Sequence, residues 1–318
     1  MGRRHRLTTT SMMSAAAIAP ATTTSGAGVS TPRRRSVAWL GLLPFAGYVL
    51  LFLAVPAVLA VGSGFFTRAG AFTLANLAAF ADPNIQKAFL ASIGISALTA
   101  VAGAVIGAVV CFALLGTRSD GFLRTAVDSA SSVLAQFGGV MLAFAFIATI
   151  GQQGLITKWL ISSGLADNVF LNFNNQGPLL YQISGLNIVY LYFQVPLMVL
   201  TFMPAMEGLK STWAEASATL GGTRLTYWTR IGMPILAPAF FGSLILLFAN
   251  SFSSYATAAA LLSQGGIIPL AIKQQSSSET VVGVANVSGV LALGMVVVMI
   301  VLMTAYAALQ RRASRWQR

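Results

Sequence analysis

The stretch PAMEGLKSTWAEASATLGGTRLTYWTRIGMP, residues 204–234, decides the fold of this chain, because it is polar and mixed in charge while long apolar blocks lie on both sides of it. Thr212 and Glu215 have the spacing of a capping box, in which each side chain satisfies an unpaired backbone N–H of a first helical turn. Gly221 stands where a helix ends in a residue with positive φ, a conformation that costs glycine least. The stretch therefore predicts a short helix capped at both ends.

The composition outside this stretch indicates a membrane protein. Of the 318 residues 56% are hydrophobic and 8% are charged, whereas soluble domains are roughly 25% charged. Cys111 is the single cysteine and His5 the single histidine, so an internal disulfide and histidine-based chemistry are excluded. We expect no catalytic residue and no metal site in this chain.

The apolar blocks predict an all-α polytopic membrane protein with six transmembrane helices, each long enough for a hydrocarbon layer of about 30 Å. Gly103 and Gly107 form a small-xxx-small pair suited to close helix packing. Residues 263–283 are expected to form a loop, and residues 155–165 a short surface helix. The expected spans are 37–62, 87–115, 126–150, 185–206, 234–262 and 284–309.

Basic residues set the expected orientation of these spans. With a disordered basic tail at residues 1–36 and a second tail at 310–318 on the cytoplasmic side, all but four of the 19 Lys and Arg residues are cytoplasmic. The positive-inside rule favours this arrangement, with both termini in the cytoplasm. The net charge of +12 is thus explained by topology, and we expect no nucleic-acid partner. The four Lys and Arg residues that this arrangement places on the outer side are Arg68, Lys87, Lys158 and Lys273.

The spacing within residues 215–234 resembles the EAA motif of ABC importer permeases. In that motif Glu-Ala-Ala is followed after three residues by Gly, and after nine more by Ile, any residue, Leu and Pro. Ser217 replaces the second Ala and Met233 replaces Leu, and both changes keep the size class. The matching residues are Glu215, Ala216, Ser217, Gly221, Ile231 and Pro234.

Three further blocks are similar to a subset of these permeases that serves polyamines, opines, phosphonates, thiamine and iron. They are QFGGVMLAFAF from Gln136, YFQVPLMVL from Tyr192 and LFANSFSSYATA from Leu247. The resemblance implies a small polar solute, such as a polyamine or an aminophosphonate. It covers most of residues 40–312.

The resemblance implies a permease subunit of a type I importer in the bacterial inner membrane. Its partners would be ABC ATPase subunits, a second permease subunit, an external substrate-binding protein and the lipid bilayer. The short helix would be the coupling helix, with the residues named above and Thr212 contacting the ATPase. The chain lacks the Gly-x-x-x-x-Gly-Lys-Ser/Thr phosphate loop. We therefore expect no cofactor in this chain, with ATP and Mg bound by the partner ATPase.

Polar residues inside the spans are candidates for the substrate path. If the fifth span is one continuous helix, four of these candidates lie on the same face of it. They are Ser243, Asn250, Ser254 and Thr257. The alternative is interhelical hydrogen bonding within the bundle, a common role for such residues. The candidates are Gln136, Gln194, Ser243, Asn250, Ser254 and Thr257.

Asp128 is an acid at the start of the third span, four residues after Arg124. An i, i+4 surface ion pair is the expected arrangement. A self-sufficient secondary transporter or channel is the alternative function, and a membrane scaffold is a third class. Ion-coupled transporters normally place ionisable groups within their spans, and this sequence has no evident relay of that kind.

Overall fold

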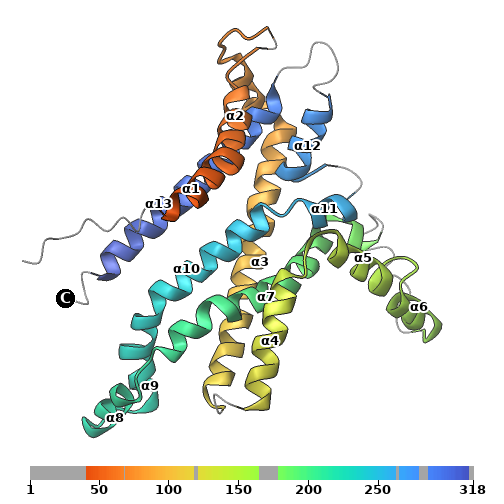
Figure 1. Cartoon of the computed structure of the whole chain (residues 1–318). Coiled ribbons are helices and arrows are strands. Elements are labelled where there is room, and N and C mark those ends of the chain that lie inside the picture. The colour runs from red at the N-terminus through yellow and green to blue at the C-terminus, as the bar shows by residue number, and fades with distance from the viewer. Residues whose placement is uncertain are drawn as a thin grey trace, which may run out of the picture. The chain divides into compact units, whose positions relative to one another are not determined.

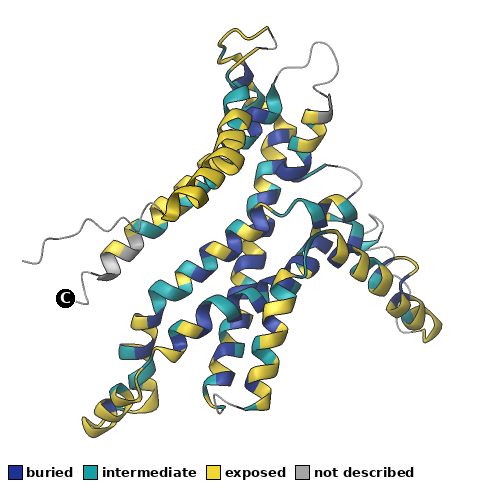
Figure 2. Cartoon of the chain, viewed as in Figure 1, coloured by how far each residue is buried: buried dark blue, intermediate teal, exposed yellow. Residues whose placement is uncertain are grey.

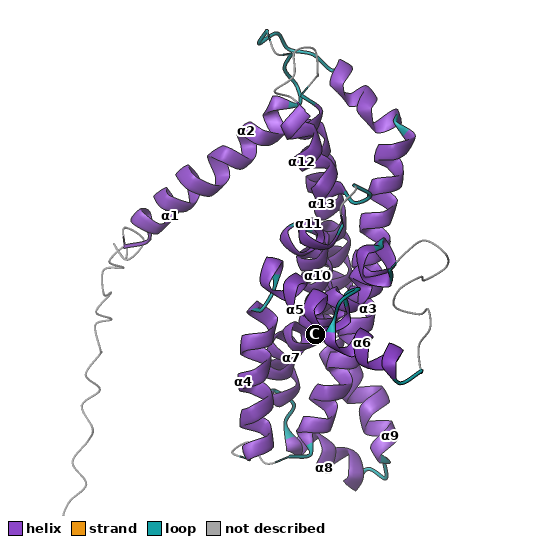
Figure 3. Cartoon of the chain, turned by 90° about the vertical axis from the view of Figure 1, so that its right-hand side faces the viewer, coloured by secondary structure: helices purple, strands orange, loops and turns teal. Residues whose placement is uncertain are grey.

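The computed structural model describes residues 41–67, 69–117, 121–164, 178–262, 265–278 and 286–314. The expected tail at residues 1–36 lies outside this part of the chain. The chain divides into two compact units, residues 1–50 and 51–318. The described residues are overwhelmingly helical (Figure 3), with one isolated antiparallel bridge between Phe66 and Phe72.

The helices follow one another in a single all-α series (Figure 1). The 3-10 and π-helical segments carry the label η. The elements are α1 (Leu43–Val49), η2 (Leu50–Ala54), α2 (Val55–Ser63), η3 (Ala75–Ala81), α3 (Pro83–Leu115), α4 (Phe122–Gln136), α5 (Gly139–Ile150), α6 (Leu155–Ser162), η5 (Leu179–Tyr181), α7 (Ile183–Glu207), α8 (Ser211–Thr219), α9 (Arg224–Tyr227), η6 (Trp228–Gly232), α10 (Met233–Phe252), α11 (Ala256–Leu261), α12 (Ile268–Ser278) and α13 (Val287–Ser314).

Six helical stretches of the described chain are long and apolar enough to cross a membrane, which confirms the six-span all-α fold. Their bounds differ from the expected ones, most of all in the third and fifth spans. The stretches are Leu43–Ser63, Pro83–Leu115, Gly139–Ser162, Ile183–Glu207, Arg224–Phe252 and Val287–Ala308.

Within residues 51–318, the most buried positions lie along α3, α7 and α10 (Figure 2). Asp82 caps α3 by accepting a hydrogen bond from Asn84 N at 2.8 Å. A Cβ at Gly103 would lie 2.6 Å from Gln194 Cβ, and one at Gly107 would lie 2.5 Å from Met198 Cβ. The predicted small-xxx-small pair is therefore confirmed as the place where α3 approaches α7 too closely for any side chain.

The third span is not the continuous helix 126–150 that the sequence predicts. α4 ends at Gln136 and α5 begins at Gly139, whose φ is +71°. Gly138 is extended, and the positive φ of Gly139 suits a residue without a Cβ, so the backbone leaves the helix at this pair. The third stretch that is long and apolar enough to cross a membrane instead consists of α5 and α6.

The fifth span also differs from its expected bounds, 234–262. It begins ten residues earlier, at Arg224, and ends at Phe252. Ser253 donates its hydroxyl to Ala249 O at 2.9 Å, and the Tyr190 hydroxyl donates to Ser254 O at 2.8 Å. The local bond of Ser253 competes with helix continuation, and the chain leaves the helix before α11 begins at Ala256.

Residues 268–278, expected to be loop, form α12 instead. The helix predicted at 155–165 is present as α6 up to Ser162, but it belongs to the third apolar stretch, and its expected place at the membrane surface stays a prediction. α13 meets α2 at a glycine pair, since a Cβ on Gly289 would lie 2.4 Å from Gly64 N. Asn286 joins the same ends by donating to Ser63 O at 3.1 Å.

Candidate functional site

α8 begins two residues before the position that the capping box predicts. Its N-cap is Lys210, which makes no side-chain cap hydrogen bond, and Thr212 lies inside the first turn. The Thr212–Glu215 box is therefore wrong. The reason lies before the helix: Leu209 packs against the core and Lys210 is extended with ψ 133°. The helix consequently begins as soon as the chain leaves the bundle.

The C-terminal end of α8 confirms the predicted glycine stop. Gly221 has φ +77°. Its N–H donates to Ala218 O at 3.0 Å, and Gly222 N donates to Ser217 O at 2.8 Å. These two bonds make a Schellman motif, which satisfies carbonyls that the helix end leaves unpaired. A Cβ on Gly221 would meet no atom within 4 Å, so the space beside it is open to solvent or to a partner.

Thr223 is a capping residue that the sequence reasoning missed. Its Oγ1 accepts a hydrogen bond from Thr226 N at 3.3 Å and starts α9. The Gly221–Gly222 pair immediately before a threonine was a signal that could have identified it, since a new helix has to start after the chain turns. After α9, Pro234 has no N–H to donate to residue 230, and the π-helical turn η6 precedes it.

A groove of about 550 Å³ lies between α8 and the start of the fifth span. Ser217 is buried at its wall, while Glu215 and Ala216 on α8 are exposed. Leu220 and Leu225 next to it are 88% and 73% exposed. The groove therefore combines an apolar rim with polar groups of α8 and of the start of the fifth span. The lining residues are Trp213, Ala216, Ser217, Leu220, Gly222, Thr226, Arg230, Ile231 and Ile235.

Three of the six substrate-path candidates are buried between helices. Gln194 is 0% exposed, and its Nε2 donates to Leu247 O at 2.9 Å. Thr257 is also 0% exposed and donates to Gly139 O at 3.1 Å. Ser243 is buried as well. Gln194 and Thr257 thus make hydrogen bonds between helices, which is the alternative to a role in the substrate path.

The other three candidates border the two helix breaks. Gln136 ends α4 and is exposed, Asn250 is exposed near the end of α10, and Ser254 is half-buried in the second break. The single helical face predicted for the fifth span is therefore wrong, because α10 ends at Phe252. The helices that follow the two breaks, α5 and α11, are joined by the hydrogen bond from Thr257 to Gly139 O.

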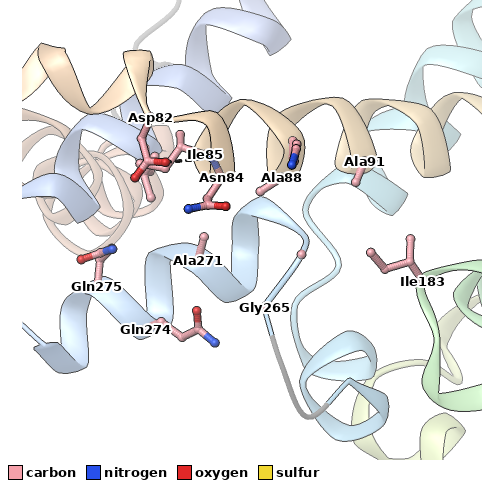
Figure 4. Close-up of a pocket in the computed structure, with 13 residues that line it drawn as sticks. Asp82, Asn84, Ile85, Ala88, Ala91, Ile183, Gly265, Ala271, Gln274 and Gln275 are labelled. Atoms are coloured by element: carbon pink, nitrogen blue, oxygen red, sulfur yellow. Dashed lines mark hydrogen bonds between the residues drawn. The ribbon is translucent and has the colours of Figure 1, made fainter. Parts of the chain in front are cut away.

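A second hollow, of about 680 Å³, lies between the start of α3 and α12, at the end of the bundle away from α8 (Figures 1 and 4). Asp82 and Lys87 contribute charges of both signs, and Asn84, Gln274 and Gln275 contribute amides. Figure 4 shows Asn84 pointing from α3 into the space above α12. The hollow can accommodate a small solute with polar groups.

The i, i+4 pair between Arg124 and Asp128 is confirmed, with Nε–Oδ2 at 3.0 Å. It is not the surface pair that was expected, because Arg124 is buried. Burial lowers the pKa of this guanidinium, but hydrogen bonds and the charges of Asp128 and Glu207 outweigh that effect and hold the pKa above its ordinary value. Arg124 is thus a buried cation at every physiological pH.

The chain was compared with known proteins. No family model matches it. It is similar to the molybdenum transport system permease protein ModB of Mycobacterium tuberculosis, with 26% identity over 177 residues, 54% of this chain and 60% of that protein. It thus spans about 60% of the ModB length.

It is also similar to the spermidine/putrescine transport system permease protein PotB of Escherichia coli K12, with 22% identity over 212 residues, 65% of this chain and 74% of that protein. The fold matches the crystal structure of a bacterial ABC transporter involved in the import of the acidic polysaccharide alginate. The TM-score is 0.69 at 16% identity, covering 87% of this chain and 95% of that one.

Proposed function

The chain is a homologue of ABC transporter permeases with the fold of an importer's transmembrane subunit, and from this premise we propose that it forms the solute path of a type I importer. ATP is hydrolysed by a separate ATPase chain. A second permease subunit and an external binding protein complete the transporter. A self-sufficient transporter or channel is not favoured, because the relatives named above are permeases of ABC systems.

The observation that carries the proposal is the construction of α8. It is a short helix outside the bundle, closed by Gly221 with φ +77° and flanked by the exposed Leu220. Within the described residues α8 buries Ser217 and half-buries Trp213 and leaves its other side chains exposed, so most of its surface is available to a partner. We propose that α8 is the coupling helix, and that Glu215 and Ala216 on its exposed side contact the ATPase.

Gly221→Asp tests this assignment. The substitution costs roughly 1–2 kcal/mol of backbone strain, because Gly221 has positive φ. It also places a carboxylate in the open space beside the helix. We expect membrane abundance near wild type, with reduced co-purification of the ATPase and reduced uptake. Glu215→Ala should have a smaller effect in the same direction. Quantitative blotting, pull-down and uptake are measured in the same cells.

Gly70→Asp is the matched control. Gly70 has φ +81°, and a Cβ there would also meet nothing within 4 Å, so the strain and the available space are alike. Gly70 lies in the turn that contains the hydrogen bond from Gly70 N to Thr67 O, outside the segment of α8. Full ATPase binding and full uptake with Gly221→Asp, as with Gly70→Asp, would remove the main support for a coupling helix.

For the substrate, we propose a small polar solute such as a polyamine or an aminophosphonate. The similarity to PotB supports the polyamine, and the charges of Asp82 and Lys87 in the hollow beside α12 suit a solute with polar groups. The test is ligand binding by the partner binding protein, with putrescine, spermidine, 2-aminoethylphosphonate, molybdate and sulfate compared by calorimetry. Binding of molybdate or sulfate alone would contradict this substrate class.

A further inference from the structure

Arg124 joins two helices at the end of the bundle that carries α8. Its Nε donates to Asp128 Oδ2 at 3.0 Å, one turn further along α4, and its Nη2 donates to Glu207 Oε1. Glu207 is the last residue of α7, and 83 positions separate it from Arg124. The ion pair therefore bridges the start of α4 and the end of α7.

The exposure of the three side chains distinguishes the two contacts. Arg124 is 8% exposed, whereas Asp128 and Glu207 are 46% and 50% exposed. An unpaired buried cation is strongly destabilising, so Arg124 has to keep a carboxylate partner. Asp128 provides one within α4 itself. Arg124 would therefore keep a carboxylate partner without Glu207. The contact with Glu207 is an additional link, between α4 and α7.

This link lies directly beside α8. Only Gly208, Leu209 and Lys210 separate Glu207 from the first residue of α8. Leu209 packs against the core rather than forming a free loop. The connection between α8 and Glu207 is therefore short and packed, as a mechanical link between them requires.

At its other end, α4 reaches the first helix break. It ends at Gln136, and Gly139 O, three residues on, accepts the hydrogen bond from Thr257 of α11. One helix therefore runs from the Arg124–Glu207 contact to the break before α5, whose first residue is hydrogen-bonded to α11. Three of the solute-path candidates, Gln136, Asn250 and Ser254, border these two breaks.

We propose that Arg124 and Glu207 form a clasp that transmits the movement of α8 to α4, and through α4 to the breaks that border the solute path. The clasp rests on the proposed function, in which α8 follows the ATPase. Arg124 and Glu207 are positioning residues in this role, since they touch neither solute nor ATP.

Glu207→Gln and Asp128→Asn are a matched pair of tests. Each removes one negative charge from the same triad with little change of shape, and each leaves Arg124 with one carboxylate. Only Glu207→Gln cuts the link between α4 and α7. The chain is reconstituted in proteoliposomes with its ATPase, second permease and binding protein, and uptake and ATP hydrolysis are measured on one preparation.

We expect Glu207→Gln to lower the solute imported per ATP hydrolysed by about fivefold or more, the size of a typical coupling between sites, with hydrolysis retained. Asp128→Asn should keep the wild-type ratio. The charge-swapped variant Arg124→Glu/Glu207→Arg, made in the Asp128→Asn background so that the new carboxylate does not face Asp128, should recover most of the ratio, because it restores the bridge with opposite polarity. A contact that only stabilises the bundle would change protein abundance and leave the ratio unaltered.

Equal ratios for Glu207→Gln and Asp128→Asn would overturn the clasp. If Glu207→Gln protein were lost from membranes, the charge-swapped variant decides: recovery of abundance and ratio supports the clasp, and failure to recover overturns it. A wild-type chain that binds no ATPase would instead overturn the proposed function. The two failures are therefore distinguishable.

Discussion

Thr223 is the residue whose side chain starts a helix in the segment around α8, and Thr212 is not. We expect Thr223→Ala to lower the free energy of unfolding by about 1 kcal/mol, the usual cost of losing an N-cap. Thr212→Ala should stay within about 0.5 kcal/mol of wild type, as surface substitutions do. Thermal unfolding of the detergent-solubilised protein compares the two variants. Equal losses would mean that Thr223 does not cap α9.

At the scale of elements, the approach of α3 to α7 sets the bundle. A Cβ on Gly107 would lie 2.5 Å from Met198 Cβ, and both backbones are fixed by their own helices. We expect Gly107→Val to destabilise the protein by about 1–3 kcal/mol, the usual range for overpacking. The aggregation temperature in detergent measures this loss.

Gly94 on the same helix provides the control. It is exposed, and a Cβ there would meet nothing within 4 Å. Gly94→Val should therefore leave the aggregation temperature close to wild type. A fall as large as that of Gly107→Val would assign the effect to helix propensity rather than to the contact with α7.

At the scale of the whole molecule, the orientation in the membrane stays a prediction from the basic residues. Reporter fusions after Gly70, Gly164 and Gly265 should report the outside, and fusions after Asp120 and Gly222 the cytoplasm; Gly164 is used because the third apolar stretch extends to Ser162. The physical reason is the excess of Lys and Arg on one side of the spans. α8 has to face the cytoplasm, where ATP is, for the proposed coupling to operate. One reversed reporter would refute this topology.

The sequence alone determined the features that depend on local composition and on the backbone conformation of single residues. Six apolar stretches are each long enough to cross a membrane, and they are helical because a helix pairs its own backbone groups in lipid. Gly221 ends α8 because the turn needs positive φ, and Gly103 and Gly107 mark the helix contact because only small residues permit it. Each of these features depends on a few residues that are close together in the sequence.

Only the tertiary structure decided the features that depend on distant partners. α10 ends at Phe252 beside the hydrogen bond from Tyr190 to Ser254 O, whose partners are 64 positions apart. α8 begins at Ser211 rather than after Thr212, because Leu209 is held by the core. Arg124 is buried because Glu207 approaches it from the end of α7. Side-chain spacing along one helix carries no information about such partners, since packing brings them together only after the helices have formed.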